Sequence, residues 1–380
     1  MLRVTDAYGP IPYSKMQNGT FSVPYDSQRD VYMAMIDDLD AAMETLYTFA
    51  SAGDGILMRD FDISSFKGDS RLWVSFANTL KLRMAIRMSG VEPEARRIAE
   101  EAVRDMATYG LIDANAENLS FSSDSRQNPF YTQATSTSWQ DLRSNASIVM
   151  YMNAYEDPRR ASYFSKSGYD GIYVGVRAGI QNVTPTDYAT YSYPLFAEKD
   201  PVPVMYASES WFLRAEGALL GWTMGDTAEN LYNTGVKTSL ELRGNGSSYE
   251  TYIASETAPA LSYADPRNKH NVSDFGTAVS VKWADDGNEL ERIITQKWIA
   301  NHMIGHEAWA DVRRTGYPRL LQVVNNLSGG MWGNVDSSKG MRRLHYPQSE
   351  YDNNRENVLK GVELLGGSDL HGTDVWWAKK

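Results

Sequence analysis

The chain of 380 residues contains no cysteine. That absence excludes disulfide bonds, cysteine-ligated zinc and thiol nucleophiles, and no lipid can be attached here through a cysteine. Long hydrophobic runs are also missing, since no segment approaches the roughly 18 apolar residues that a membrane-spanning helix needs. The mean hydropathy is −0.46, and the hydrophobic content of 42% is that of an ordinary globular chain. A chain of this length can therefore bury a large core without covalent cross-links.

Basic clusters are scarce as well. Asp and Glu outnumber Lys and Arg by 48 to 37, the net charge is −11, and no basic run is longer than Arg-Arg. Proteins that bind nucleic acid carry a positive face for the phosphate backbone, so we expect no nucleic-acid partner. The opening segment "MLRVTDAYGPIPYS" lacks the basic and apolar regions of a signal peptide. Because a globular domain rarely opens on a Gly-Pro loop, we expect that an N-terminal segment was removed.

Motifs that carry catalysis are few. The sequence has no G-x-G-x-x-G, P-loop or G-x-S-x-G motif, and it has only five histidines. His302 and His306 lie four residues apart and precede Glu307, but Gly305 weakens a helix there and no third ligand is evident. We therefore expect packing rather than a metal site at these histidines, no cofactor, and binding rather than catalysis.

Three other charged patterns have simpler explanations. The segment Asp60–Asp69 imitates the start of a calcium loop, but it lacks the glycine at the sixth position and the final glutamate. Glu198 and Asp200 could pair as in a glycosidase, although such pairs arise by chance among 48 acidic residues. Asp311 lies three residues before Arg314, a spacing that suits an ion pair on a helix surface.

Periodic apolar positions predict a mostly helical fold. Apolar residues that recur every three or four positions place the helical core mainly at 27–110, 207–256 and 288–325. Residues 1–25, which contain three prolines and two glycines, are expected to form a loop, and the last forty residues to be mostly extended or irregular. Helix pairs of roughly 34 residues suggest a TPR-like arrangement.

Several residues mark expected helix ends and contacts. Ser27 is expected to cap the first long helix, and Asn288 with Glu291 to form a capping box. Gly217 and Gly221 are small and four residues apart, so we expect a neighbouring helix to approach them closely.

Two regions break the helical pattern, mainly at 113–205 and 325–350. They are rich in Gly, Ser, Thr, Pro and aromatic residues, and they include short strand-like stretches such as "GIYVGV". Long ordered loops are often functional, so we expect the ligand region here.

The aromatic content is large for so polar a sequence, with 10 Trp and 23 Tyr. Sugars present flat C–H faces that stack on aromatic rings, and their hydroxyls need polar side chains beside those rings. The alternative is that each ring only anchors its loop to the protein body. The residues of the polar segments that we predict as ligand contacts are Asn128, Tyr131, Gln133, Trp139, Trp283 and Trp332.

Ten short segments, in order along nearly the whole sequence, carry a resemblance to a known family: "YGPIPYS", "FANTLKLRMAIR", "NPFY", "DPR", "YVGVRAG", "SESWFLRAEGALLG", "TQKWIAN", "EAWADVRRTGYP", "YPQSEYDNNRENV" and "DVWW". Together they resemble the SusD/RagB-like nutrient-binding proteins, in particular their second large subgroup. The resemblance implies a single SusD-like domain over 1–380, mostly α, with TPR-like helix pairs, long loop-rich insertions and a few short strands. It also implies that Gln296–Leu320 is a helix-turn-helix of the core, in which Trp298 and Trp309 pack.

The resemblance implies a function as well. Family members are lipoproteins on the outer membrane of Gram-negative bacteria that capture glycans, or for some members peptides, above a SusC-like TonB-dependent transporter, and they are not enzymes. The expected ligand is therefore an oligosaccharide. Members carry a signal peptide, a lipid-bearing cysteine and first helices before the "YGPIPYS" segment, and this sequence starts at that segment. Peptide capture by the same fold and a helical glycoside hydrolase stay open as alternatives.

Overall fold

A computed structural model describes residues 1–16, 19, 22–57, 59–123, 127–134 and 142–379. In these ranges the fold is mostly helical with few strands, as predicted. The α-helices are α1 (Leu2–Tyr8), α2 (Gln28–Ala52), α3 (Ser70–Arg87), α4 (Ala95–Arg104), α5 (Met106–Tyr109), α6 (Pro129–Ala134), α7 (Ala146–Ala154), α8 (Arg160–Tyr163), α9 (Ala207–Leu219), α10 (Ala228–Leu242), α11 (Tyr249–Ile253), α12 (Glu289–Ala300), α13 (Gly305–Thr315), α14 (Gln348–Asn353) and α15 (Arg355–Leu365). The 3-10 helices are η1 (Asn115–Glu117), η2 (Pro185–Tyr188), η3 (Gly246–Ser248), η4 (Gly330–Trp332) and η5 (Trp376–Ala378). The strands β1 (Leu119–Phe121) and β2 (Val202–Met205) pair antiparallel.

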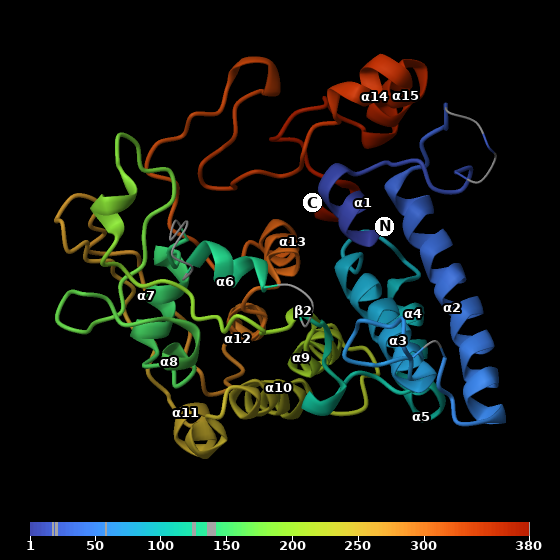
Figure 1. Cartoon of the computed structure of the whole chain (residues 1–380), viewed down its shortest axis with the longest axis horizontal. Coiled ribbons are helices and arrows are strands. Elements are labelled where there is room, and N and C mark those ends of the chain that lie inside the picture. Colours follow the sequence, from blue (N-terminus) through green and yellow to red (C-terminus); the bar gives the residue numbers. More distant parts are fainter. Residues whose placement is uncertain (17–18, 20–21, 58, 124–126, 135–141, 380) are drawn as a thin grey trace.

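The first long helices form one side of the molecule. Figure 1 shows α2, α3 and α4 beside one another on the right, and α3 contacts both of the others. Ser27 caps α2 as predicted, because its hydroxyl accepts a hydrogen bond from the Asp30 backbone N–H at 3.1 Å. Asp69 caps α3 in the same way through the Arg71 N–H at 2.9 Å. Both helices contribute apolar residues to the main core, for example Val31 of α2 and Leu82 of α3.

The second helical layer is built from α9, α10 and α12, which contact one another. Gly235 of α10 lies against the ring of Phe212 in α9, so close that a Cβ at this position would lie 3.0 Å from two ring carbons. Phe212 is fully buried and belongs to the same core as α2 and α3. A glycine inside a helix is unfavourable by itself, so here it is explained by the close approach of the two helices.

The expected contact at Gly217 and Gly221 is confirmed for the first glycine only. A Cβ at Gly217 would lie 2.6 Å from the sulfur of Met224 and 3.4 Å from Ile86 in α3. Gly221 was predicted wrongly as a contact, because α9 ends at Leu219 and, apart from its chain neighbours, no described residue has an atom within 4 Å of a Cβ at Gly221. Its positive φ of 76° makes it a turn residue after the helix.

A buried network of charges joins α1, α3, α9 and α13. Arg87 of α3 pairs with Asp6 of α1 and with Glu307 of α13. Arg83, one turn earlier, pairs with Glu209 of α9 at 2.7 Å. All five side chains are at most 8% exposed, so each charge depends on its partners for compensation.

The ion pair expected between Asp311 and Arg314 forms, at 3.3 Å, but it is not on the surface. Both side chains are at most 10% exposed, and Arg314 also pairs with Glu216 of α9. Sequence spacing identified the partner, whereas the burial arises from tertiary contacts such as the pairing of Arg314 with Glu216.

Three local expectations were wrong. Residues 1–25 contain helix α1, because Leu2 and Ala7 are buried and the glycines and prolines begin only after Tyr8. The last forty residues contain α14 and α15, and α15 packs through Gly361 against the ring of Tyr25. Asn288 precedes α12 as expected, but its side chain makes no cap hydrogen bond.

The remaining part of the chain surrounds α7 and α8, on the left of Figure 1. Here the "GIYVGV" stretch at 171–176 does not form a strand, and only an isolated bridge joins Asn145 to Val176. Gly175 lies so close to the backbone of Asn145 that a Cβ there would be 2.7 Å from its carbonyl carbon. The backbone at 171–176 is thus held against the start of α7 instead of a partner strand. Among the described residues, no helix combines the length and apolar character required to span a membrane.

Candidate ligand-binding pocket

The predicted contacts around α6 divide into buried and exposed residues. Asn128 is 1% exposed, and its side-chain oxygen accepts hydrogen bonds from the backbone N–H groups of Phe130 and Tyr131 at the start of α6. Tyr131 is half-buried and Gln133 is exposed. Trp139 lies outside the described residues. As ligand contacts, these four residues stay predictions.

The two other candidates pack in different parts of the molecule. Trp283 lies against Tyr232 of α10, with 5.5 Å between ring centroids, and its N–H donates to Asp285 at 3.0 Å. Trp332 of η4 stacks on His345 with 3.4 Å between centroids. The structure therefore gives each ring a packing partner, and neither lines the cavity described below.

The two histidines of the candidate metal site differ in their surroundings. The ring of His302 stacks on Tyr163 with 4.3 Å between centroids, and loss of solvent together with the charge of Arg243 lowers the pKa of His302 to about 3. His306 is exposed. In the described ranges, no three His, Asp or Glu side chains are grouped so that they could hold a metal ion.

The acidic patterns are tied into their own loops. The side chain of Asp62, in the segment that imitates a calcium loop, accepts hydrogen bonds from the N–H groups of Ser64, Gly68 and the Trp73 indole at 2.7–3.0 Å. The Asp200 carboxylate accepts a hydrogen bond from the Ala197 N–H at 2.8 Å. These acids stabilise turns.

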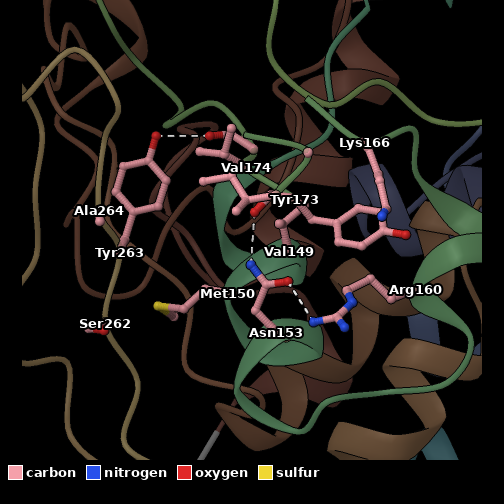
Figure 2. A pocket seen from close by; sticks show the side chains of 13 residues that line it. Val149, Met150, Asn153, Arg160, Lys166, Tyr173, Val174, Ser262, Tyr263 and Ala264 are labelled. Atoms are coloured by element: carbon pink, nitrogen blue, oxygen red, sulfur yellow. Dashed lines mark hydrogen bonds between the residues drawn. The ribbon is translucent and has the colours of Figure 1, made fainter. Parts of the chain in front are cut away.

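A cavity of about 510 Å³ opens between α7, α8 and two loop segments, 166–175 and 262–264 (Figure 2). Small-molecule sites in proteins usually have about 300–1,000 Å³ and combine apolar walls with a few polar groups. The residues that line this cavity are Val149, Met150, Asn153, Arg160, Lys166, Gly171, Ile172, Tyr173, Val174, Gly175, Ser262, Tyr263 and Ala264.

Helix α7 supplies one wall of the cavity. Asn145 caps the helix by accepting a hydrogen bond from the Ser147 N–H at 2.8 Å, which fixes where the helix begins. Val149, Met150 and Asn153 follow at helical spacing and face the cavity. The wall is thus apolar, with one amide at its end.

Asn153 is the centre of a small polar group. Its side-chain nitrogen donates to the Tyr173 backbone carbonyl at 2.9 Å, and its oxygen accepts from Nη1 of Arg160 at 3.0 Å. The Arg160 guanidinium also lies over the Tyr173 ring, 4.9 Å from its centroid. The three side chains therefore hold one another in place at the cavity wall.

The opposite wall is formed by Tyr263 (Figure 2). Its hydroxyl donates to the Gly175 carbonyl at 2.8 Å, and burial raises the pKa of this hydroxyl above its usual value. The ring is therefore neutral and fixed at physiological pH. A cavity with a tyrosine on each side and amide and guanidinium donors between them can hold a flat, oxygen-rich molecule.

Sequence reasoning missed this arrangement. It placed the ligand region mainly at 113–205, which includes α7 and α8, but it did not single out Asn153, Arg160 or Tyr173. Tyr263 lies about a hundred residues further along the chain, outside both expected ligand regions. The available signal was the run of glycines and aromatic residues that includes "GIYVGV" at 171–176, which was interpreted as strand.

Nearly the whole chain matches one protein family. A family model described as "SusD-like: Susd and RagB outer membrane lipoprotein" matches residues 1–378. No curated protein matches the chain.

Solved structures match over the full length of this chain. A chitin-binding SusD homolog from Flavobacterium johnsoniae is 40% identical, with a TM-score of 0.92, over 100% of this chain and 78% of that chain. A SusD homolog from Bacteroides uniformis is 42% identical, with a TM-score of 0.91, over 100% and 79%. A SusD homolog from Bacteroides thetaiotaomicron is 40% identical, with a TM-score of 0.89, over 100% and 79%.

Proposed function

This chain belongs to the SusD-like family of outer membrane lipoproteins, and from that membership we propose that it captures oligosaccharides at the cell surface for a TonB-dependent transporter. In this proposal the helical part is the scaffold of a single domain, and the cavity beside α7 binds the sugar without changing it chemically. The family description supports the outer membrane as its location.

The observation that carries the proposal is the cavity between Tyr173 and Tyr263. Its volume of about 510 Å³ suits a small-molecule ligand, and its walls offer two rings with Asn153 and Arg160 as hydrogen-bonding groups. A chitin-binding relative with 40% identity supports a glycan as the ligand class. The predicted contacts near α6 and at Trp283 and Trp332 would belong to further contact regions of a longer glycan.

A screen of oligosaccharides by isothermal titration calorimetry tests the ligand class. The panel should include chito-oligosaccharides, since a similar protein binds chitin, together with neutral and acidic plant and host glycans and a set of short peptides. We expect saturable binding of at least one oligosaccharide. Binding of peptides alone would favour peptide capture and contradict the proposal.

The same samples distinguish binding from hydrolysis. After prolonged incubation, we expect no new reducing ends. Release of reducing ends that a Glu198→Gln or Asp200→Asn variant abolishes would instead identify a glycoside hydrolase.

The partner is tested with the full-length, lipidated protein. Affinity purification from detergent-solubilised outer membranes is expected to recover a TonB-dependent transporter. Repeated recovery of no such protein would count against delivery to a transporter and would leave glycan binding untouched.

A further inference from the structure

The charges around the cavity all have one sign. Among its lining residues, Arg160 and Lys166 are charged, and no aspartate or glutamate lines it. This is unexpected in a chain in which acidic residues outnumber basic ones by 48 to 37. Asp170 neighbours the lining residue Gly171 in the chain but does not line the cavity.

Arg160 differs from its neighbour Arg159. The Arg159 guanidinium is fully buried and pairs with both carboxylate oxygens of Asp157, with Nε at 2.9 Å from one oxygen and Nη2 at 2.6 Å from the other. The Arg160 side chain has no carboxylate partner in the described part of the chain, and its one side-chain hydrogen bond there goes to the neutral amide of Asn153 at 3.0 Å. The two adjacent arginines thus differ, because the charge of Arg159 is compensated by Asp157 inside the fold, whereas Arg160 carries its charge to the cavity without an acidic partner among the described residues.

The position of Arg160 is nevertheless fixed. The amide of Asn153 accepts a hydrogen bond from Nη1, and the guanidinium carbon lies over the Tyr173 ring, 4.9 Å from its centroid. The nitrogens Nε and Nη2 make no hydrogen bond to any described residue. An arginine held in this way loses little conformational freedom when its remaining N–H groups bind a ligand.

Lys166 supplies a second positive charge at the rim. Its side chain is exposed, its stem lies beside Gly171, and its amino group has no ion-pair partner within the described ranges. An exposed ammonium group contributes mainly through long-range attraction, which salt weakens. Arg160 and Lys166 together give the cavity a positive field without a compensating acid on its wall.

We propose that this cavity takes a sugar that carries a carboxylate, such as a uronic acid residue of an oligosaccharide. The inference rests on the proposed function and specifies its ligand. The two free nitrogens of the Arg160 fork would bind the two carboxylate oxygens, a geometry that one planar guanidinium satisfies by itself. Lys166 attracts the acid to the rim, and the rings of Tyr173 and Tyr263 bound the sugar on either side.

Calorimetry with matched sugars tests this assignment. The probes are a galacturonate tetrasaccharide and a hyaluronan tetrasaccharide, each with its carboxyl-reduced form, in which –COO⁻ becomes –CH₂OH and the rest is unchanged. Chitotetraose is the neutral reference. We expect at least one acidic probe to bind about ten-fold or more tightly than its reduced form, as expected for a charge-assisted bidentate contact. This preference should weaken as sodium chloride rises from 50 to 300 mM.

Variants identify the groups responsible. Arg160→Gln should remove most of the preference for the acid, and Arg160→Lys, which keeps the charge but not the fork, should remove part of it. Lys166→Gln should weaken the acidic probe about three-fold and leave the neutral sugar unaffected. Lys360→Gln, the same change at an exposed lysine of α15 remote from the cavity, should bind every probe like the wild type. Thermal melts of all variants identify any that fail to fold, and Lys166→Gln, being exposed, keeps the test valid if Arg160→Gln does not fold.

The outcomes separate the two proposals. Three results would overturn the carboxylate assignment and leave glycan capture standing. They are equal binding of the acidic and reduced forms, tighter binding of chitotetraose than of the acidic probes, and an unchanged preference for the acid in the Arg160 and Lys166 variants. Tighter binding of a sulfated sugar than of the uronates would also overturn it. If neither these probes nor the wider glycan panel bind, both proposals fail.

Discussion

Replacing Gly235 by alanine tests how closely α9 and α10 approach each other. The new Cβ would lie 3.0–3.1 Å from three ring atoms of Phe212, whose side chain is fully buried. Two effects oppose each other. Alanine is favoured over glycine inside a helix by about 0.5–1 kcal/mol, whereas an extra methyl group in a filled core typically costs about 1–3 kcal/mol. Because the Phe212 ring also packs against Tyr232, with 6.1 Å between centroids, it has little room to retreat. We therefore expect a net loss of about 1 kcal/mol in the free energy of unfolding.

Urea unfolding followed by circular dichroism measures this loss. The control is Gly305→Ala at the first residue of α13, where no described residue beyond its own helix and chain neighbours places an atom within 4 Å of a Cβ, so this variant should be neutral or slightly more stable. In a Phe212→Leu background the Gly235→Ala change should become less harmful, because the smaller side chain gives space to the methyl group. If Gly235→Ala stabilises the protein as much as Gly305→Ala does, the two helices are further apart than described here and the reasoning is refuted.

Three further predictions concern stability. Gly217→Leu should lower the free energy of unfolding by about 1–3 kcal/mol, because its Cβ alone would lie 2.6 Å from the Met224 sulfur, and melting within a degree or two of the wild type would contradict this. Burial acts to raise the pKa of Glu307, but Arg83 and Arg87 outweigh it and hold the pKa at about 2, so its contribution to stability is complete above about pH 4.5 and is lost as the pH falls towards 2. Glu307→Gln should therefore cost about 3 kcal/mol at pH 7 and make acid unfolding less steep, whereas an unchanged acid slope would show that other carboxylates dominate. The lowered pKa of His302, about 3, means that the unfolded chain binds a proton between pH 3 and 6.5 that the folded ring does not, so stability rises with pH in this window. His302→Phe should lose that part of the pH dependence. Denaturant midpoints at pH 4.5 and 7 measure it, and a difference between the two midpoints as large as that of the wild type would contradict the prediction.

Helix positions were predictable where the signal is local. Ser27 has a hydroxyl that can cap the first turn of α2 whatever surrounds it, and this prediction is confirmed. The segment Leu2–Tyr8 carried no such signal, since its helix is stabilised by contacts with residues far along the chain, such as the pairing of Asp6 with Arg87. For the same reason the short helices α14 and α15 were missed, because they depend on packing against the N-terminal segment around Tyr25.

The candidate cavity was less predictable than the fold. Its two tyrosine walls come from positions 173 and 263, and only the folded loops bring them together. Sequence reasoning looked for aromatic rings in polar loops, a pattern that a ring packed against its own loop also satisfies. Trp283 and Trp332 show this ambiguity, because each has an aromatic or histidine partner within the fold. The sequence pattern of one segment does not distinguish an aromatic ring that packs against the protein from one that contacts a ligand.

Closing the cavity is the most direct test of the central claim that glycan is captured there. Ser262 is exposed and lines the cavity, so Ser262→Trp should fill its mouth without disturbing the core. Ser51→Trp makes the same change at an exposed position near the end of α2, on the other side of the molecule, and serves as the matched control. Calorimetry with an oligosaccharide that the wild type binds should show at least a ten-fold loss of affinity for Ser262→Trp, wild-type affinity for Ser51→Trp, and similar melting temperatures for both. Wild-type affinity in Ser262→Trp would place the glycan site elsewhere and contradict the account.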